Sequence, residues 1–190
     1  LTREEVLAVI GESGDSWLSQ RDHALFLLMY NTGARVSEII GIKVGDVVLD
    51  ANAACVHLHG KGRKQRSVPL WRSTVKAIRA WLHVNPQFES MTPLLPNRCG
   101  REMTRANVTL RLALAVQHAT ESQPALAKRK VSPHTIRHTT AMHLLQSGVD
   151  ISVIALWLGH ESPVTTHHYV EADLAMKERA LARLHEPDSK

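Results

Sequence analysis

The chain has 190 residues, 44% of them hydrophobic and 22% charged, and a net charge of +5. This length suits one domain with a sizeable core. The sequence contains no apolar run of about 18 residues, so we expect no membrane-spanning helix. The two cysteines cannot build a disulfide framework and fit a reducing compartment, so we expect a cytoplasmic protein.

Most of the chain is expected to be helical. Thr2 and Glu5 form a capping-box pattern that predicts an N-terminal helix, and residues 11–19 are typical of a loop. A later helix places Val75, Ile78 and Leu82 on one stripe. In chain order, the predicted helices span about 2–10, 21–31, 35–40, 73–83, 104–119, 134–146, 150–158 and 173–184.

Three short strands are expected between the third and fourth of these helices, at about 46–49, 54–59 and 65–69. Asp50-Ala51-Asn52 marks the first turn and Gly60-Lys61-Gly62 the second. The predicted fold class is therefore mainly α with a small three-stranded antiparallel sheet, an α+β architecture.

Positive charge is concentrated in the later part of the chain. Residues 1–34 hold two arginines against five acidic residues, a net charge of −3. Local basic clusters suit a polyanionic partner, although a solvated surface with a few extra lysines is the simpler alternative. Besides Lys61, the candidate DNA-binding residues are Arg63, Lys64, Arg66, Lys128, Arg129 and Lys130.

The side chains best suited to chemistry occur in five short motifs. A free tyrosine is a poor nucleophile because its pKa is about 10, but neighbouring cations stabilise the phenolate and the charge that builds on a phosphate. The combination suggests phosphoryl transfer through a phosphotyrosine. The motifs are Thr32-Gly33-Ala34-Arg35-Val36-Ser37-Glu38, Gly60-Lys61-Gly62, His134-Thr135-Ile136-Arg137-His138, Leu158-Gly159-His160 and Tyr169.

In their order, spacing and context these motifs resemble the tyrosine recombinases, the phage-integrase family, over nearly the whole chain. The resemblance implies that residues 1–190 form a recombinase catalytic domain. It also implies that the N-terminal core-binding domain usual in the family is absent from this chain. We therefore expect a DNA recombinase or integrase that breaks and rejoins strands.

Several residues have a candidate catalytic role. Two guanidinium forks, Arg35 and Arg137, can hold and neutralise one phosphate. His134 can accept or hold a proton near that phosphate, because imidazole titrates near neutral pH. The resemblance makes Tyr169 the nucleophile and His160 a hydrogen-bond donor to the phosphate.

Lys61 lies between two glycines at the expected hairpin tip, where it can reach a DNA groove. The resemblance makes it the general acid for the leaving 5′ oxygen, with Lys64 as a nearby competitor. Glu38 is expected to support the site by orienting a basic neighbour. His138 is a second supporting residue; with His134 it could also form a zinc pair, but no Glu lies between them and no third ligand is obvious.

The resemblance implies double-stranded DNA as the partner, no cofactor and no metal. It further implies a homotetramer on DNA, with contacts between protomers through the C-terminal helix. Bacterial, phage or plasmid origin and association with the nucleoid would follow. Two alternatives remain: DNA relaxation like that of a type IB topoisomerase, and a catalytically silent DNA-binding protein of the same fold.

Overall fold

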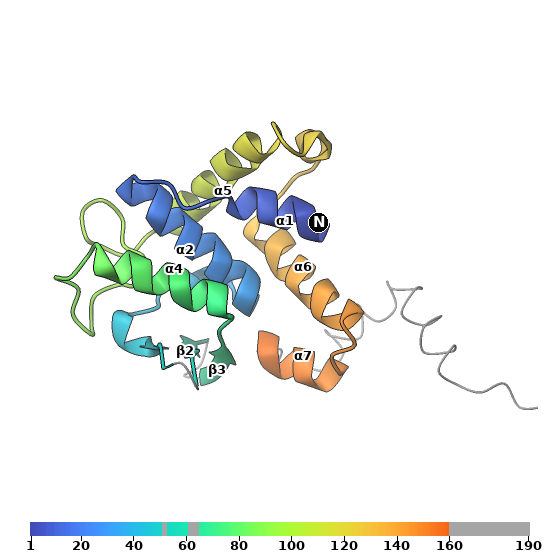
Figure 1. The fold of residues 1–190 in the computed structure, drawn as a ribbon. Coiled ribbons are helices and arrows are strands. Elements are labelled where there is room, and N and C mark those ends of the chain that lie inside the picture. The colour runs from blue at the N-terminus through green and yellow to red at the C-terminus, as the bar shows by residue number, and fades with distance from the viewer. Residues whose placement is uncertain (51–52, 61–64, 160–190) are drawn as a thin grey trace, which may run out of the picture. The chain divides into compact units, whose positions relative to one another are not determined.

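The computed structural model describes residues 1–50, 53–60 and 65–159 (Figure 1). They belong to two compact units, Leu1–Thr140 and the residues from Ala141 onward, each described by itself. Several predicted features lie outside the described residues: the turn at 51–52, the hairpin tip with Lys61, Arg63 and Lys64, the residues His160 and Tyr169, and the helix at 173–184.

The predicted fold class is confirmed, since helices dominate and one small sheet is present. The capping box of Thr2 and Glu5 opens the first helix as expected. The second helix starts earlier than predicted, because Ser16 accepts a hydrogen bond from the backbone of Ser19 and caps it; the end of the predicted loop is therefore helical. The α-helices are α1 (Arg3–Ile10), α2 (Trp17–Thr32), α3 (Val36–Ile40), α4 (Arg72–His83), α5 (Arg105–Ala119), α6 (Pro133–Gln146) and α7 (Ile151–Leu158).

The sheet is an antiparallel meander in the order β1-β2-β3. The edge strand β1 (Val47–Val48) is shorter than predicted because a 3-10 turn, η1 (Val44–Asp46), takes its first residue. Strands β2 (Cys55–His59) and β3 (Gln65–Pro69) match the prediction closely. Val56 lies opposite Val68 and both are buried, so one face of the hairpin packs inward.

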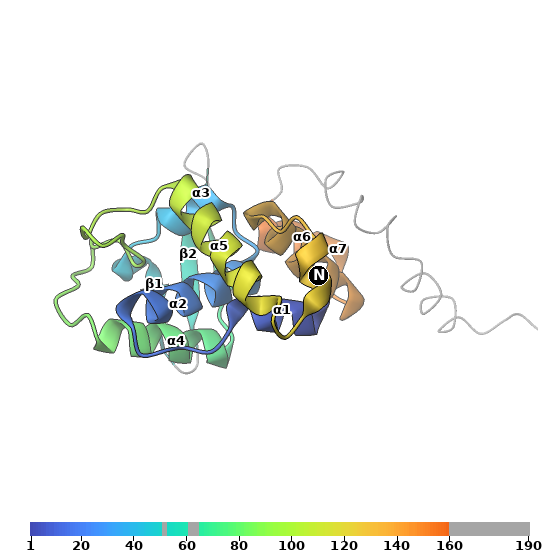
Figure 2. The ribbon, with the colours of Figure 1, turned by 90° about the horizontal axis from the view of Figure 1, so that it is seen from above.

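Helix α2 is the centre of the first unit. It packs against α1 and α3, and α4 runs beside it in both views (Figures 1 and 2). Figure 2 also shows α3 close to the first turn of α5, with which it is in contact. Helix α4 buries Val75 and Ile78 as predicted, but Trp81 rather than Leu82 is fully buried. The Trp81 indole N–H donates to the Leu94 carbonyl at 2.7 Å, which fixes the ring under the following loop.

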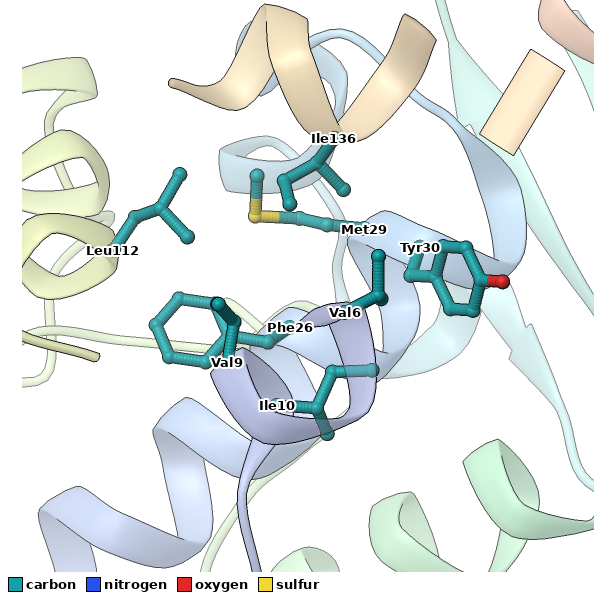
Figure 3. Close-up of a pocket in the computed structure, with 8 residues that line it drawn as sticks. All are labelled: Val6, Val9, Ile10, Phe26, Met29, Tyr30, Leu112 and Ile136. Carbon is teal, nitrogen blue, oxygen red and sulfur yellow. The ribbon is translucent and has the colours of Figure 1, made fainter. Parts of the chain in front are cut away.

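Where α1, α2, α5 and the start of α6 meet, a small apolar pocket remains in the core (Figure 3). The space between these side chains is too narrow to admit a water molecule. It is therefore a packing gap and not a ligand site. The lining residues are Val6, Val9, Ile10, Phe26, Met29, Tyr30, Leu112 and Ile136.

The second unit contains the end of α6 and the whole of α7 among its described residues. Ala141 and Leu145 pack against Ile154 and Leu158, and all four are fully buried. Asp150 caps α7 and Gly159 ends it in the left-handed conformation, both as predicted. No helix within the described ranges is long and apolar enough to cross a membrane.

Candidate active site

The turn that carries Arg35 is held in one conformation. Gly33 ends α2 with φ 56°, a left-handed conformation that glycine adopts without the usual Cβ clash. Thr32 donates its hydroxyl to the Leu28 carbonyl at 2.7 Å, and its oxygen accepts from the backbone of Ala34 at 3.2 Å. Arg35 therefore enters α3 as its N-cap residue, and not within the helix as predicted.

Glu38 lies beneath this turn as a buried carboxylate. It accepts the Arg35 backbone N–H at 2.7 Å, and its other oxygen lies 3.4 Å from the Arg35 guanidinium. Arg66 donates to both carboxylate oxygens, at 2.8 and 2.9 Å. Burial alone would raise the pKa of Glu38, but the hydrogen bonds and charges of Arg66 and Arg35 outweigh it and hold that pKa below its usual range.

Arg137 reaches the same turn from a helix a hundred residues later in the chain. Its guanidinium donates to the Gly33 carbonyl at 2.6 Å, and only 8% of the residue is exposed. Thr140, one turn further along α6, donates to the Tyr30 carbonyl at 2.8 Å. These two bonds attach the first turns of α6 to the end of α2. Sequence reasoning assigned no role to Thr140 or to the Gly33 carbonyl.

The two histidines of the α6 motif are exposed, unlike the arginine between them. Ser132 and Thr135 exchange hydrogen bonds at the start of the helix, so its first turn, with His134, is fixed. Partial desolvation lowers the pKa of His138. Among the described residues, no three His, Cys, Asp or Glu side chains gather as metal ligands would.

The predicted basic residues fall into different environments. Lys128 and Lys130 are exposed on the connection before α6, whereas the neighbouring Arg129 pairs at 3.2 Å with the buried carboxylate of Glu5. Arg66 is only 14% exposed, because it lies opposite Leu58 on the inward face of the hairpin. The alternation of β3 was the signal that could have revealed this, since Arg66 shares its face with Val68.

The described part of the site thus combines a fixed turn, a half-exposed Arg35 and a buried Arg137 attached to that turn. Guanidinium groups suit the non-bridging oxygens of a phosphate, which they bind bidentately and neutralise. Preorganised donors of this kind act on the charge that develops during phosphoryl transfer.

Comparison with known proteins identifies relatives of this chain. The model of the phage integrase family matches residues 1–176. A putative integrase/recombinase, y4rC, of Sinorhizobium fredii is 45% identical over 186 residues, which are 96% of this chain and 55% of that protein. Tyrosine recombinase XerC of Neisseria meningitidis is 43% identical over 162 residues, covering 85% of this chain and 50% of that protein. The chain thus spans about half the length of these relatives.

Solved structures show the same fold. The crystal structure of XerA recombinase has a TM-score of 0.81 at 25% identity, over 98% of this chain and 64% of that one. The XerH site-specific recombinase, bound to its palindromic difH substrate after cleavage, has a TM-score of 0.79 at 24% identity, over 96% of this chain and 52% of that one. The resemblance first drawn from five motifs is confirmed: the chain belongs to the phage integrase family of tyrosine recombinases.

Proposed function

We propose that residues 1–190 act as the catalytic domain of a site-specific DNA recombinase, which breaks and rejoins strands through a 3′-phosphotyrosine. The observation that carries the proposal is the convergence of Arg137 and Arg35 on one turn, through the 2.6 Å bond to Gly33. A DNA-binding protein without catalysis has no need of a nucleophile, whereas this sequence carries the full set of Arg35, Lys61, His134, Arg137, His160 and Tyr169. The relatives named as recombinases support the same activity.

In the proposed reaction the phenolic oxygen of Tyr169 attacks a DNA phosphate, and His134 accepts the phenolic proton. The bond from phosphorus to the 5′ oxygen breaks, and that oxygen leaves with a proton from Lys61. Arg35, Arg137 and His160 stabilise the charge on the phosphate oxygens. A 5′-hydroxyl of a second strand then attacks the phosphotyrosine and releases Tyr169.

Because the phosphotyrosine conserves the energy of the broken bond, strand exchange through it needs no nucleotide cofactor. Double-stranded DNA is the proposed partner, and the DNA-bound XerH and transposon integrase structures are neighbours in fold. Lys128 and Lys130 are proposed to contact the DNA backbone, together with Arg63 and Lys64. A homotetramer joined by C-terminal contacts would bring two DNA sites together.

Covalent capture on genomic DNA tests the proposal. The full-length protein is incubated with fragmented DNA of its host, denatured with detergent, and the protein-linked fragments are sequenced. We expect a small set of sites, with breaks that carry a free 5′-hydroxyl opposite the linked 3′ end. Linkage through the 5′ end, or no linkage, would contradict the proposal. Relaxation of supercoiled DNA without four-way junctions would favour the topoisomerase alternative.

A further inference from the structure

The carboxylate of Glu38 is shared unequally between two arginines. Arg66 donates to both of its oxygens, at 2.8 and 2.9 Å, whereas the Arg35 guanidinium lies 3.4 Å from one of them. The Arg35 side chain is 44% exposed, and that of Glu38 only 3%. The carboxylate therefore holds Arg35 mainly through its backbone N–H, at 2.7 Å, and more weakly through its guanidinium, at 3.4 Å.

Arg66 lies on the inward face of the β2–β3 hairpin, among buried apolar side chains. In the register of the hairpin Arg66 is opposite Leu58, and Val68, two residues along, is opposite Val56. The three apolar side chains are fully buried, so Arg66 is on the face of the hairpin that packs inward. An arginine in such a position needs an acidic partner, because an unpaired charge destabilises the fold far more when it is buried than when it is on the surface.

We propose that Arg66 is a positioning residue of the phosphate site: its fork bonds both oxygens of Glu38, so that this carboxylate fixes the Arg35 turn while its contact with the Arg35 guanidinium stays weak, at 3.4 Å. The proposal rests on the proposed function, in which Arg35 binds the DNA phosphate. It assigns Arg66 a role different from the DNA contact that its place in a basic cluster suggested.

The physical reason is competition between two anions for one cation. A buried carboxylate strongly favours a partner with two parallel N–H donors. If Arg66 is removed, the other guanidinium that pairs with Glu38 among the described residues is that of Arg35, which would swing inward. A phosphate would then have to displace a buried carboxylate before it could bind Arg35. A shift of about 1 Å in a catalytic group can cost on the order of 10²-fold in rate.

The test uses the full-length protein and a nicked suicide duplex that carries a captured site. Single-turnover adduct formation is measured at saturating DNA for Arg66→Met, Glu38→Gln and the double variant, and the dissociation constant for DNA is measured separately. We expect Arg66→Met to slow adduct formation about 10²-fold while the dissociation constant changes less than about twofold. The double variant should react faster than Arg66→Met, because the competing carboxylate is gone.

Three results of this kinetic comparison would overturn the proposal. The first is an Arg66→Met rate within about twofold of wild type. The second is a double variant whose loss is the product of the two single losses. The third is weaker binding with a salt slope smaller by about one, at an unchanged rate on bound DNA, which would make Arg66 a phosphate contact. If Arg66→Met does not fold, Arg66→Lys replaces it in the test, since lysine keeps the charge but loses the fork. Arg66→Lys should slow adduct formation at least about tenfold, and an unchanged rate overturns the proposal.

A matched control separates positioning from simple loss of stability. Arg111 pairs with the buried carboxylate of Asp22, donating from Nε at 2.6 Å, so Arg111→Met also breaks an ion pair to a buried acid. Both variants should unfold more easily than wild type, but only the Arg66 variant should react slowly. An equal loss of rate in the two variants would show that Arg66 acts through stability alone.

A second readout does not depend on catalysis. Phenylglyoxal modifies exposed guanidinium groups, and mass spectrometry follows its reaction with Arg35 in the absence of DNA. Arg35 should react more slowly in Arg66→Met than in wild type and recover in the double variant; an unchanged reaction rate overturns the proposal. If wild type forms no adduct with DNA, the proposed function fails, and this measurement still decides whether Arg66 controls Arg35.

Discussion

The guanidinium of Arg137 donates to the carbonyl of Gly33 at 2.6 Å, although the two residues are 104 positions apart in the chain. Gly33 directly precedes Ala34 and Arg35, so the bond attaches one candidate phosphate ligand to the turn that presents the other. Any movement of the first turns of α6 relative to this turn would stretch the buried hydrogen bond between Arg137 and Gly33. The Arg137 guanidinium is therefore held at the turn that presents Arg35 before DNA arrives.

This bond makes Arg137→Lys a severe substitution. A lysine ammonium has no planar fork, so it cannot hold the Gly33 carbonyl and two phosphate oxygens in the same geometry. We expect the single-turnover rate of adduct formation to fall about 10²–10³-fold. Arg79→Lys is the matched control, because Arg79 also donates to a backbone carbonyl, that of Leu49, on the exposed side of α4. If the two variants lose the same activity, Arg137 has no special role.

The low pKa of Glu38 predicts a pH-dependent contribution to stability. A carboxyl whose pKa is lower in the folded than in the unfolded protein stabilises the fold at pH values above its ordinary pKa, which is 4.5 for Glu38. That contribution is lost as the pH falls through the lower, folded value. Glu38→Gln should therefore reduce the free energy of unfolding by about 3 kcal/mol at neutral pH, and by progressively less below about pH 4.5.

Denaturant unfolding across this pH range measures the difference. Glu102→Gln is the control, because Glu102 pairs with Lys43 while half exposed, and a surface pair contributes less than about 1 kcal/mol. A Glu38→Gln difference that stays constant from neutral to acidic pH would contradict the assigned ion pairs.

Cleavage should not depend on a divalent metal. Arg35 and Arg137 provide the positive charge that a metal would otherwise bring to the phosphate. Adduct formation in excess chelator should equal that in untreated protein. Loss of activity on chelation, restored by zinc or magnesium, would instead support the alternative in which His134 and His138 bind a metal.

The role of Lys61 as general acid can be separated from a role in binding. General acid catalysis typically contributes about 10²–10⁴-fold, and Lys61→Ala should slow cleavage by that order. Sulfur in place of the bridging 5′ oxygen leaves without needing a proton, so it should largely restore this variant and leave the defect of Arg137→Ala. If sulfur rescues Lys64→Ala instead, Lys64 is the acid.

Local sequence patterns predicted much of the fold. The cap at Thr104 and the pair Asp150 and Gly159 located α5 and α7 correctly, because each cap is made by a neighbouring side chain or by glycine itself. The predicted start of α2 was wrong because Ser16 was not recognised as the N-cap residue. Trp81 was overlooked because its partner, the Leu94 carbonyl, belongs to a loop with no periodic pattern.

For the site too, local patterns predicted the candidate residues but not the long-range contacts between them. Motifs identified Arg35 and Arg137 as candidates, but the bond that joins Arg137 to Gly33 connects distant segments, and no local periodicity encodes it. Glu38 was expected to orient a basic neighbour, and the structure places both Arg35 and Arg66 on it. Net charge grouped Arg66 with the DNA-binding candidates, whereas strand alternation, which places it inward beside Val68, gives the better description of its surroundings.

Formation of a covalent adduct through Tyr169 tests the central claim most directly. The full-length protein is mixed with a nicked suicide duplex of a captured site, and the adduct is digested and mapped by mass spectrometry. Wild type should yield one DNA-linked peptide, which contains Tyr169, and Tyr169→Phe should yield none while still binding the duplex. Tyr30→Phe should retain the adduct, since Tyr30 is buried in the core of the first unit. An adduct in the Tyr169→Phe variant, or one mapped to another residue, would contradict the account.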